Sequence, residues 1–375
     1  MVNYSCYVCD ELLTKENETS EHIILNAIGG KLKSKRLICR ICNSKFGSNI
    51  DDELAEQLST FSTLLNVKRD NGKPRNIKGE YKGTEIYIEP SGKMKRAKPK
   101  IHIDGNKYDI TTSTISEARS VMNGLKRKYP KLDVETEIAK AKVDEVYLPE
   151  IKVNFGIGGE NAFRSICKAA INYYILCGGD SSFIKHLIPY IEGHSENENV
   201  YYFYPQNEVF YKGKEEVFHS LILIGEPKNN KLFVYVEYFN EIKFIVMLNE
   251  NYEGPSIYNS YHYDVVSNKE VDFDRKFIIT TRDLKRYAKI EPDVDAIIKR
   301  VSHLLQRIDK VKVSRRISEI TSTAMEVVKS KYPESEYEYF TPEMINLFTN
   351  EVVNKFMLSF QHRIFDRDNL ENVNF

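Results

Sequence analysis

The chain has 375 residues, of which 41% are hydrophobic and 11% aromatic, so it can form two or three folded domains and is not intrinsically disordered. Its 54 basic and 54 acidic residues give a formal net charge of zero, which indicates neither a nucleic-acid partner nor its absence. There is no run of about 18 apolar residues that would predict a membrane span. The first residues, Met-Val-Asn-Tyr-Ser-Cys, do not match a signal peptide, so we expect a cytoplasmic protein.

Four cysteines near the N-terminus form two Cys-x-x-Cys pairs, Cys6 with Cys9 and Cys39 with Cys42. Two such pairs supply the four thiolates of a tetrahedral zinc site. The segment between them is short and has little apolar interior, and a structural zinc ion contributes roughly 10–16 kcal/mol in small metal-folded peptides. Zinc is therefore the favoured interpretation. Disulfides are the alternative, and they belong to an oxidising compartment.

Glu21 and His22 lie between the two cysteine pairs, and Asn43 directly follows the last cysteine. Residues 21–25 are typical of a strand, 27–30 of a turn and 40–46 of a helix, so the predicted order is strand, loop, strand, helix. A carboxylate and an amide oxygen can bind Mg²⁺, and a histidine that does not bind the metal can take a proton from water. These three residues are therefore candidates for phosphodiester hydrolysis.

The order of these residues resembles the HNH, or ββα-metal, endonuclease superfamily, most closely the branch that carries four zinc cysteines. The resemblance covers residues 1 to about 58. It implies that His22 is the general base and that Glu21 and Asn43 bind a catalytic Mg²⁺ or Mn²⁺ ion. It also implies a structural zinc ion that is bound by Cys6, Cys9, Cys39 and Cys42.

The chain departs from the pattern of that family at one position. Many HNH motifs have an asparagine about five residues before the second Cys-x-x-Cys, and Ser34 occupies that place here, so the role is not transferred. Asp51 follows the motif and is either a further metal ligand or, as we favour, the cap of a helix that starts at Asp52. A module of this kind that has lost cleavage would be a zinc-stapled binding module.

Basic residues are concentrated in two stretches. Residues 31–45 contain no acidic residue, and residues 68–100 contain many more basic than acidic residues. The two stretches form either a surface that contacts phosphates or a solvated linker. The candidate nucleic-acid contacts are Lys33, Lys35, Arg36, Arg40, Lys45, Lys95, Arg96 and Lys98.

The whole chain is predicted to be an α+β protein in four parts. We place a nuclease module at 1–60, a basic β-rich connector with one helix at 61–150, an α+β domain at 151–280 and a helical region at 281–375. Strands are expected at 84–89, 100–104 and 151–155, and helices at 115–129 and 161–177. Four further strands, at 200–204, 217–224, 232–239 and 241–248, predict an antiparallel sheet, and C-terminal helices are expected at 293–308, 313–331 and 341–361.

Few features of the larger region indicate chemistry. The glycine turn at 156–159, with Arg164 and Lys168 in the next helix, is either a phosphate site or a tight strand-to-helix turn, and its spacing favours the turn. Cys167 and Cys177 are isolated in an apolar stretch and are expected to be buried thiols. This region is expected to choose the target or to sense a signal.

These observations predict a metal-dependent HNH endonuclease that acts on DNA. Restriction or phage defence is suggested by family analogy alone. Because one HNH site cuts one strand, double-strand cleavage would imply a homodimer or two binding events. The alternatives are a non-catalytic zinc-stapled module that binds nucleic acid and a nuclease effector that is gated by a ligand.

Overall fold

The computed structural model describes residues 4–90, 92–104, 107–142, 151–154, 156–196, 199–273, 276–333 and 339–365, with side chains described to residue 357. The chain divides into two compact units. The described residues of the first unit lie within 4–142 and 151–308, and those of the second lie beyond residue 308. The four-part division expected from the sequence stays a prediction.

The N-terminal segment has the expected order of strand, loop, strand and helix. Strands β1 (Glu21–His22) and β2 (Lys33–Ser34) pair in antiparallel fashion and flank the short 3-10 helix η1 (Asn26–Ile28). Helices α1 (Arg40–Gly47), α2 (Ile50–Gln57) and α3 (Ser59–Leu64) follow. The strands have two residues each and are shorter than predicted, because the chain turns into η1 soon after His22.

The next part of the chain forms two small antiparallel sheets and a helix pair. Strands β3 (Ile77–Tyr81), β4 (Thr84–Ile88) and β5 (Met94–Arg96) make the first sheet, and β6 (Lys100–Asp104) and β7 (Lys107–Thr111) make the second. Helices α4 (Ile115–Lys126) and α5 (Val134–Ala139) follow. The strand expected at 151–155 is a single bridge between Lys152 and Glu80, and Phe155 lies outside the described residues.

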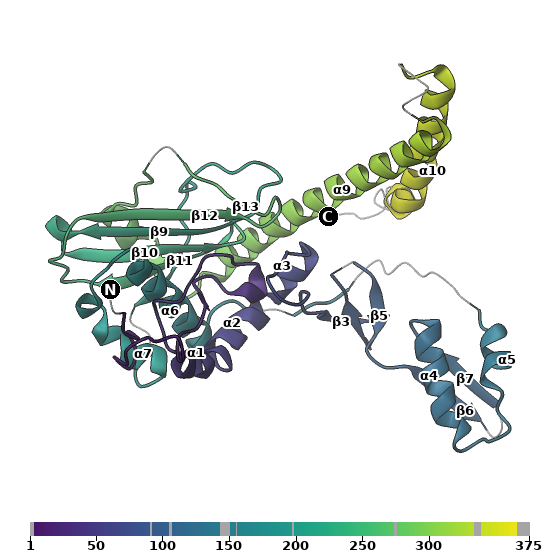
Figure 1. The fold of residues 1–375 in the computed structure, drawn as a ribbon, viewed down its shortest axis with the longest axis horizontal. Helices are drawn as coiled ribbons and strands as arrows, with labels where there is room; N and C mark the ends of the chain where they lie inside the picture. Colours follow the sequence, from purple (N-terminus) through teal and green to yellow (C-terminus); the bar gives the residue numbers. More distant parts are fainter. Residues whose placement is uncertain are drawn as a thin grey trace. The chain divides into compact units, whose positions relative to one another are not determined.

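A seven-stranded antiparallel sheet forms the largest part of the first unit (Figure 1). Its strands are β8 (Val200–Phe203), β9 (Phe218–Glu226), β10 (Lys231–Tyr238), β11 (Ile242–Asn249), β12 (Ile257–Asp264), β13 (Lys269–Glu270) and β14 (Ala288–Lys289), in the order β13-β12-β9-β10-β11-β8-β14. The predicted antiparallel sheet is therefore confirmed. The four predicted strands are the adjacent inner strands β9, β10, β11 and β8, whereas β12–β14 were not foreseen.

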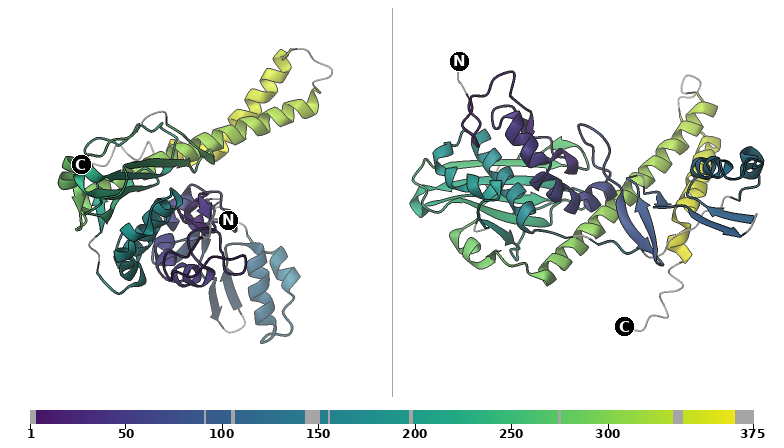
Figure 2. Two further views of the ribbon diagram at one scale, coloured as in Figure 1. Left: turned by 60° about the vertical axis from the view of Figure 1, so that its left-hand side comes forward. Right: turned by 90° about the horizontal axis from the view of Figure 1, so that it is seen from below.

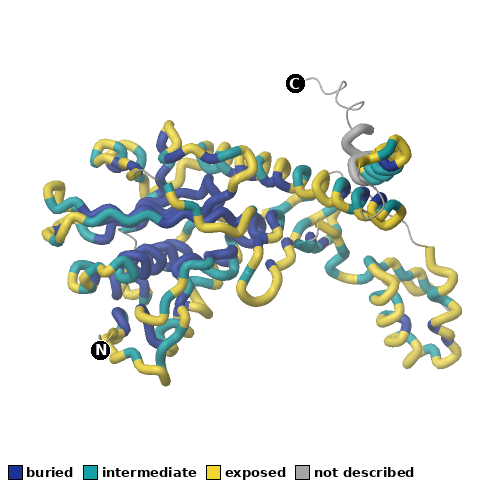
Figure 3. The backbone as a smooth tube through the Cα atoms, turned by 45° about the horizontal axis from the view of Figure 1, so that its top comes forward, coloured by how far each residue is buried: buried dark blue, intermediate teal, exposed yellow. Residues whose placement is uncertain are grey.

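The central strands are buried on both faces, which explains their nearly continuous apolar sequences (Figure 3). One face packs against a cluster of aromatic and aliphatic residues that includes Phe210, Phe277 and Leu284 of the following segments. The other face is covered by α6 (Glu160–Leu176), which also contacts α2 of the N-terminal segment (Figure 2). Helix α6 is thus the middle layer between the sheet and the N-terminal segment.

Short helical turns connect α6 to the sheet. They are η2 (Ser181–Phe183), η3 (Lys185–Leu187) and α7 (Ile188–Glu192), and η4 (Pro227–Asn229) joins β9 to β10. Among the buried sheet residues, Glu237 and Lys243 face each other across β10 and β11, and the Lys243 Nζ lies 2.5 Å from Glu208 Oε2. Glu237 and Lys243 lie within the sheet, and neither has a described interaction with the N-terminal segment.

The C-terminal part is helical, as predicted. Helix α8 (Thr281–Tyr287) is followed by α9 (Val294–Lys331) and α10 (Pro342–Phe365). The prediction of separate helices at 293–308 and 313–331 is wrong, because residues 309–312 contain no glycine or proline and the helix continues through them. Among the helices of the described residues, none has the length and apolarity required to cross a membrane.

His219 of β9 ties the sheet to the N-terminal segment. Its Nε2 lies 2.9 Å from the carbonyl oxygen of Ile28 in η1, and its Nδ1 accepts the backbone N–H of Phe239. The side chain is fully buried, and this burial lowers the pKa of His219 to about 4. The imidazole is therefore neutral in the folded protein and donates from Nε2.

This buried histidine predicts that acidification destabilises the fold. Unfolded histidine has a pKa of about 6.5, so below that pH the unfolded chain binds a proton that the folded chain excludes. The free energy of unfolding should fall by roughly 3 kcal/mol between about pH 6.5 and pH 4 from this residue. Urea unfolding across this range checks the prediction, with His219→Gln as the comparison. Equal pH dependence of the two proteins would contradict it.

Candidate metal centre and active-site pocket

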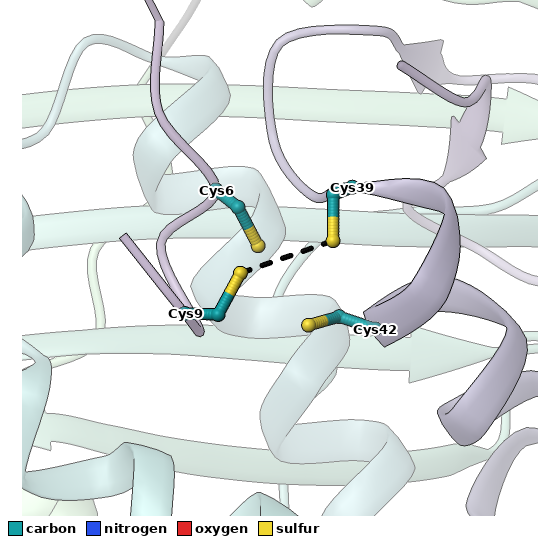
Figure 4. A group of neighbouring side chains, drawn as sticks. All are labelled: Cys6, Cys9, Cys39 and Cys42. Atoms are coloured by element: carbon teal, nitrogen blue, oxygen red, sulfur yellow. Dashed lines mark hydrogen bonds between the residues drawn. The ribbon is translucent and has the colours of Figure 1, made fainter. Parts of the chain in front are cut away.

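The four N-terminal cysteines converge on one point (Figure 4). Their sulfur atoms all lie within 4.8 Å of one another, and Cys9 Sγ and Cys39 Sγ are 3.8 Å apart. All six cysteines of the chain are free thiols, so the disulfide alternative is wrong. Four thiol groups at this spacing form a site positioned to bind a metal, and thiolate sets of this kind are typical of structural zinc.

Cys39 is also the residue that precedes α1, so the cluster fixes the start of that helix. Asn43 lies on the first turn of α1, where its backbone N–H donates to the Cys39 carbonyl at 2.9 Å. Its side-chain Nδ2 donates to Thr19 Oγ1 at 3.3 Å. This contact uses the nitrogen of the amide, and the oxygen is the atom that a hard cation would take.

Glu21, His22, Asn43 and Asp51 line a single pocket of about 230 Å³. The other residues that line it are Ser20, Leu25, Asn26, Ala27, Gly47, Asp52, Ala55 and Arg75. The structure therefore brings together the three residues that the sequence nominates for chemistry, together with Asp51. Carboxylate, amide and imidazole groups in one polar pocket fit a hard divalent cation and a proton acceptor.

The turn beneath the pocket depends on glycine. Gly29 has a φ of +93°, in the left-handed region that favours glycine. A Cβ at Gly30 would lie 1.9 Å from the carbonyl oxygen of Ile24, so no other residue fits without moving the backbone. This close approach sets the path of the chain between β1 and β2.

The side chain of His22 points to Asp70, which the sequence did not nominate. His22 Nε2 lies 3.1 Å from Asp70 Oδ2, and Lys31 and Lys33 place their Nζ atoms 2.7 and 2.8 Å from the same carboxylate. The ammonium groups of Lys31 and Lys33 and the ring of His22 hold the pKa of Asp70 well below its usual range. An ionised carboxylate only accepts, so Nε2 carries the proton and Nδ1 is the ring nitrogen with a free lone pair.

Ser34, the position where the family pattern is not met, does not contact His22 through any described hydrogen bond. Its Oγ accepts the backbone N–H of Arg36 at 3.1 Å and closes a local turn. In β2 it pairs with Glu21, and His22 pairs with Lys33. The described side-chain partner of His22 is Asp70, from a loop that lies beyond the family motif.

Glu21 is buried and is held by α6. Lys168 Nζ lies 2.7 Å from Glu21 Oε1, and Asn172 Nδ2 donates to the same oxygen at 3.0 Å. Burial raises the pKa of Glu21, and the charge of Lys168 opposes that rise. For Lys168 itself, burial lowers the pKa, but the carboxylates of Glu21 and Asp51 outweigh it and leave the pKa raised.

The interpretation of Asp51 as a helix cap is wrong. Helix α2 begins at Ile50, so Asp51 lies inside its first turn, and its carboxylate is turned toward α6 instead of its own backbone. Ser165 Oγ donates to Asp51 Oδ1 at 2.6 Å, and Lys168 pairs with Oδ2. Lys168 is 2% exposed, so it is not available to a phosphate, and residues 156–159 serve as the turn that leads into α6.

The predicted nucleic-acid contacts lie on exposed or half-buried positions. Several of them have local partners: Lys33 with Asp70, Lys35 with Glu18, Arg36 with Tyr4, Arg40 with the Glu16 carbonyl, Lys45 with Glu192 and Lys95 with Glu89. Arg96 lies at the end of β5, and Lys98 is exposed in the following turn. Of this set, only Lys33 is described in contact with the partner of His22, and their role as a phosphate surface stays a prediction.

Comparison with protein families gives one match within the chain. Residues 6–59 match the family model described as HNH endonuclease, so this segment belongs to the HNH endonuclease family. The match begins at the first cysteine of the cluster and ends just after α2. No curated protein and no solved structure matches the chain.

The cysteine cluster predicts one bound zinc ion per chain that stabilises the fold. Replacing Cys39 or Cys42 with serine should remove the zinc and lower the thermal unfolding midpoint, because the segment loses its metal cross-link. Elemental analysis of the purified protein and a thermal unfolding scan measure the two effects. Cys177→Ser is the matched control, since this thiol directly follows the last residue of α6 and is not part of the cluster. A Cys42→Ser protein that retains stoichiometric zinc would contradict the assignment.

Proposed function

We propose that the protein is a metal-dependent endonuclease that hydrolyses phosphodiester bonds, with DNA as its substrate. The observation that carries the proposal is the single pocket in which His22, Glu21 and Asn43 meet on a segment of the HNH family. The pocket combines a proton acceptor with oxygen ligands, and these are the two kinds of group that hydrolysis of a phosphodiester requires.

The cofactors follow from the donor sets. Cys6, Cys9, Cys39 and Cys42 would hold a structural zinc ion, because thiolates at tetrahedral spacing suit zinc. Glu21 and Asn43 would hold Mg²⁺ or Mn²⁺, with Asp51 as a further candidate, and the cation would stabilise charge on the phosphate and the leaving oxygen. The described contacts of Glu21 both use Oε1, and that of Asn43 uses Nδ2, which fits this assignment.

His22 would act as the general base. The Nε2–H group donates a hydrogen bond to Asp70, which leaves Nδ1 able to accept a proton from a water molecule. The side chain of His22 is 21% exposed, so water can reach it. Asp70 is thus proposed as the residue that sets the tautomer and the orientation of the base.

The substrate would approach over the basic side of the segment. Lys31 and Lys33 lie next to His22 through their shared partner Asp70, so a phosphate near the base would meet two ammonium groups. Lys35, Arg36, Arg40 and Lys45 extend the basic character along the same segment. The remaining domains would choose the target, and restriction or phage defence is proposed by family analogy alone.

Replacing the base should nearly abolish cleavage. His22→Ala is expected to lower the cleavage rate by about 10²–10⁴-fold, because no other group in the pocket can accept the proton from the same position. Plasmid and branched DNA incubated with Mg²⁺ or Mn²⁺ measure the rate, and EDTA should stop the reaction. His102→Ala is the matched control, since His102 is exposed on β6. Equal rates for His22→Ala and the wild type would refute the proposal.

Asp70→Asn should lower kcat by about 10- to 100-fold and should leave DNA affinity equal or stronger. The amide keeps the shape of the side chain but cannot balance a protonated imidazole or fix its tautomer, which is the usual cost of losing such a partner. The loss of its charge also frees Lys31 and Lys33 for phosphate. Steady-state kinetics separate the two effects. An increase in kcat would show that Asp70 blocks the base instead of orienting it.

A further inference from the structure

Helix α6 presents a polar stripe to the HNH segment. Ser165, Lys168 and Asn172 recur at spacings of three and four residues and share one side of the helix, and all three are buried. Each is bonded to a residue of the segment: Ser165 to Asp51, Lys168 to both carboxylates, and Asn172 to Glu21. Most of the other buried residues of α6 are apolar, so the buried polar residues of the helix are concentrated where it contacts Glu21 and Asp51.

Lys168 contacts the two carboxylates from outside the pocket. Glu21 and Asp51 line the pocket, whereas neither Lys168 nor Asn172 is among the lining residues. The ammonium group is 2% exposed and contacts Glu21 through Oε1. It therefore does not stand in the space that a cation would occupy. It contacts Glu21 through Oε1 alone, whereas Ser165 and Lys168 together engage both carboxylate oxygens of Asp51.

The position of Lys168 reduces the repulsion between the carboxylates of Glu21 and Asp51. Two carboxylates that face one pocket repel each other when they are removed from water, and burial favours the protonated form. A buried ammonium group that contacts both carboxylates offsets part of this repulsion and holds the two side chains in one orientation before any cation is bound. Asn172 also helps to hold Glu21. The hydroxyl of Tyr7 donates a hydrogen bond to Asn172 Oδ1 at 2.8 Å, and this contact fixes the orientation of the Asn172 amide.

We propose that Lys168 and Asn172 of α6 are positioning residues of the divalent-cation site, although they lie outside the HNH segment. They hold the Glu21 carboxylate so that its pocket-facing side can bind a hard cation of the Mg²⁺ class together with Asn43. The inference rests on the proposed function for the assignment of Glu21 and Asn43 as ligands. It adds that the affinity for the cation is set in part by α6, outside the HNH segment.

The test measures cation binding without cleavage. Zinc-loaded full-length protein is titrated with Mn²⁺, and free Mn²⁺ is followed by electron paramagnetic resonance. Glu21→Gln identifies the binding that belongs to the pocket. Lys168→Met and Asn172→Ala are each expected to weaken that binding by about 10- to 100-fold, and Lys168→Arg should recover part of the loss because it keeps the charge. Lys243→Met is the matched control, since Lys243 is an equally buried lysine of β11 that pairs with Glu208 and does not line the pocket.

The outcomes separate the possible roles. A Lys243→Met protein that is less stable but binds Mn²⁺ normally, beside a Lys168→Met protein that binds it weakly, supports positioning. Unchanged or tighter Mn²⁺ binding by folded Lys168→Met overturns it, and tighter binding would mean that the ammonium competes with the cation. If Lys168→Met does not fold, Asn172→Ala decides, because that change removes one neutral hydrogen bond. Wild-type protein that binds Mn²⁺ in the pocket but leaves DNA intact would refute the proposed hydrolysis and leave this inference standing.

Discussion

A buried ammonium group between two carboxylates connects the small N-terminal segment to the rest of the molecule. Lys168 contacts Glu21 and Asp51, and each of these acidic residues lines the pocket that contains His22. Carboxylates that face a cation site have to be close together, and in the absence of the cation their charges need a partner. Helix α6 supplies that partner, so the geometry of the pocket depends on a residue that lies outside the HNH segment.

The segment is therefore held from two directions. On one side, four thiols converge where a metal can cross-link two turns of the chain. On the other side, the polar stripe of α6 and the imidazole of His219 bind its acidic residues and its η1 turn. Neither set of contacts requires a large apolar core within the segment, which its short length could not provide. Stability and pocket geometry are thus supplied by the same contacts.

The sequence was sufficient for the features that depend on local spacing. The two Cys-x-x-Cys pairs, Glu21, His22 and Asn43 follow a fixed order within one short stretch, and the structure brings them together as that order predicts. The four strands β8 to β11 of the large sheet were predictable because their apolar runs are bounded by turns. Helix α9 was divided at residues 309–312 although no helix-breaking residue is present there, and the buried residues Leu304, Ile308 and Val311 continue one apolar side through the division.

The missed residues act over long separations along the chain. Asp70 is 48 residues from His22, and its only sequence signal is that it is an acidic residue among Lys68, Arg69, Lys73 and Arg75. Lys168 was weighed as a phosphate contact after a glycine turn, and a tight turn was favoured, but neither alternative gave it a role in the pocket. Its position beside Cys167 on an apolar helix was the signal of burial. Asp51 was taken as a cap because the partner that turns it away from the helix end lies on α6, which local reasoning does not reach.

The shared contacts limit how this HNH segment can be recombined with other proteins. A segment moved to a new host would carry Glu21 and Asp51 without the ammonium group, and the carbonyl of Ile28 without the donor from His219. Buried carboxylates that lack a counter-charge are costly, so the transplanted segment would either rearrange its pocket or take up protons. Successful chimaeras would have to keep α6 and β9 with the segment, and the unit of inheritance is therefore larger than the cysteine motif that identifies it.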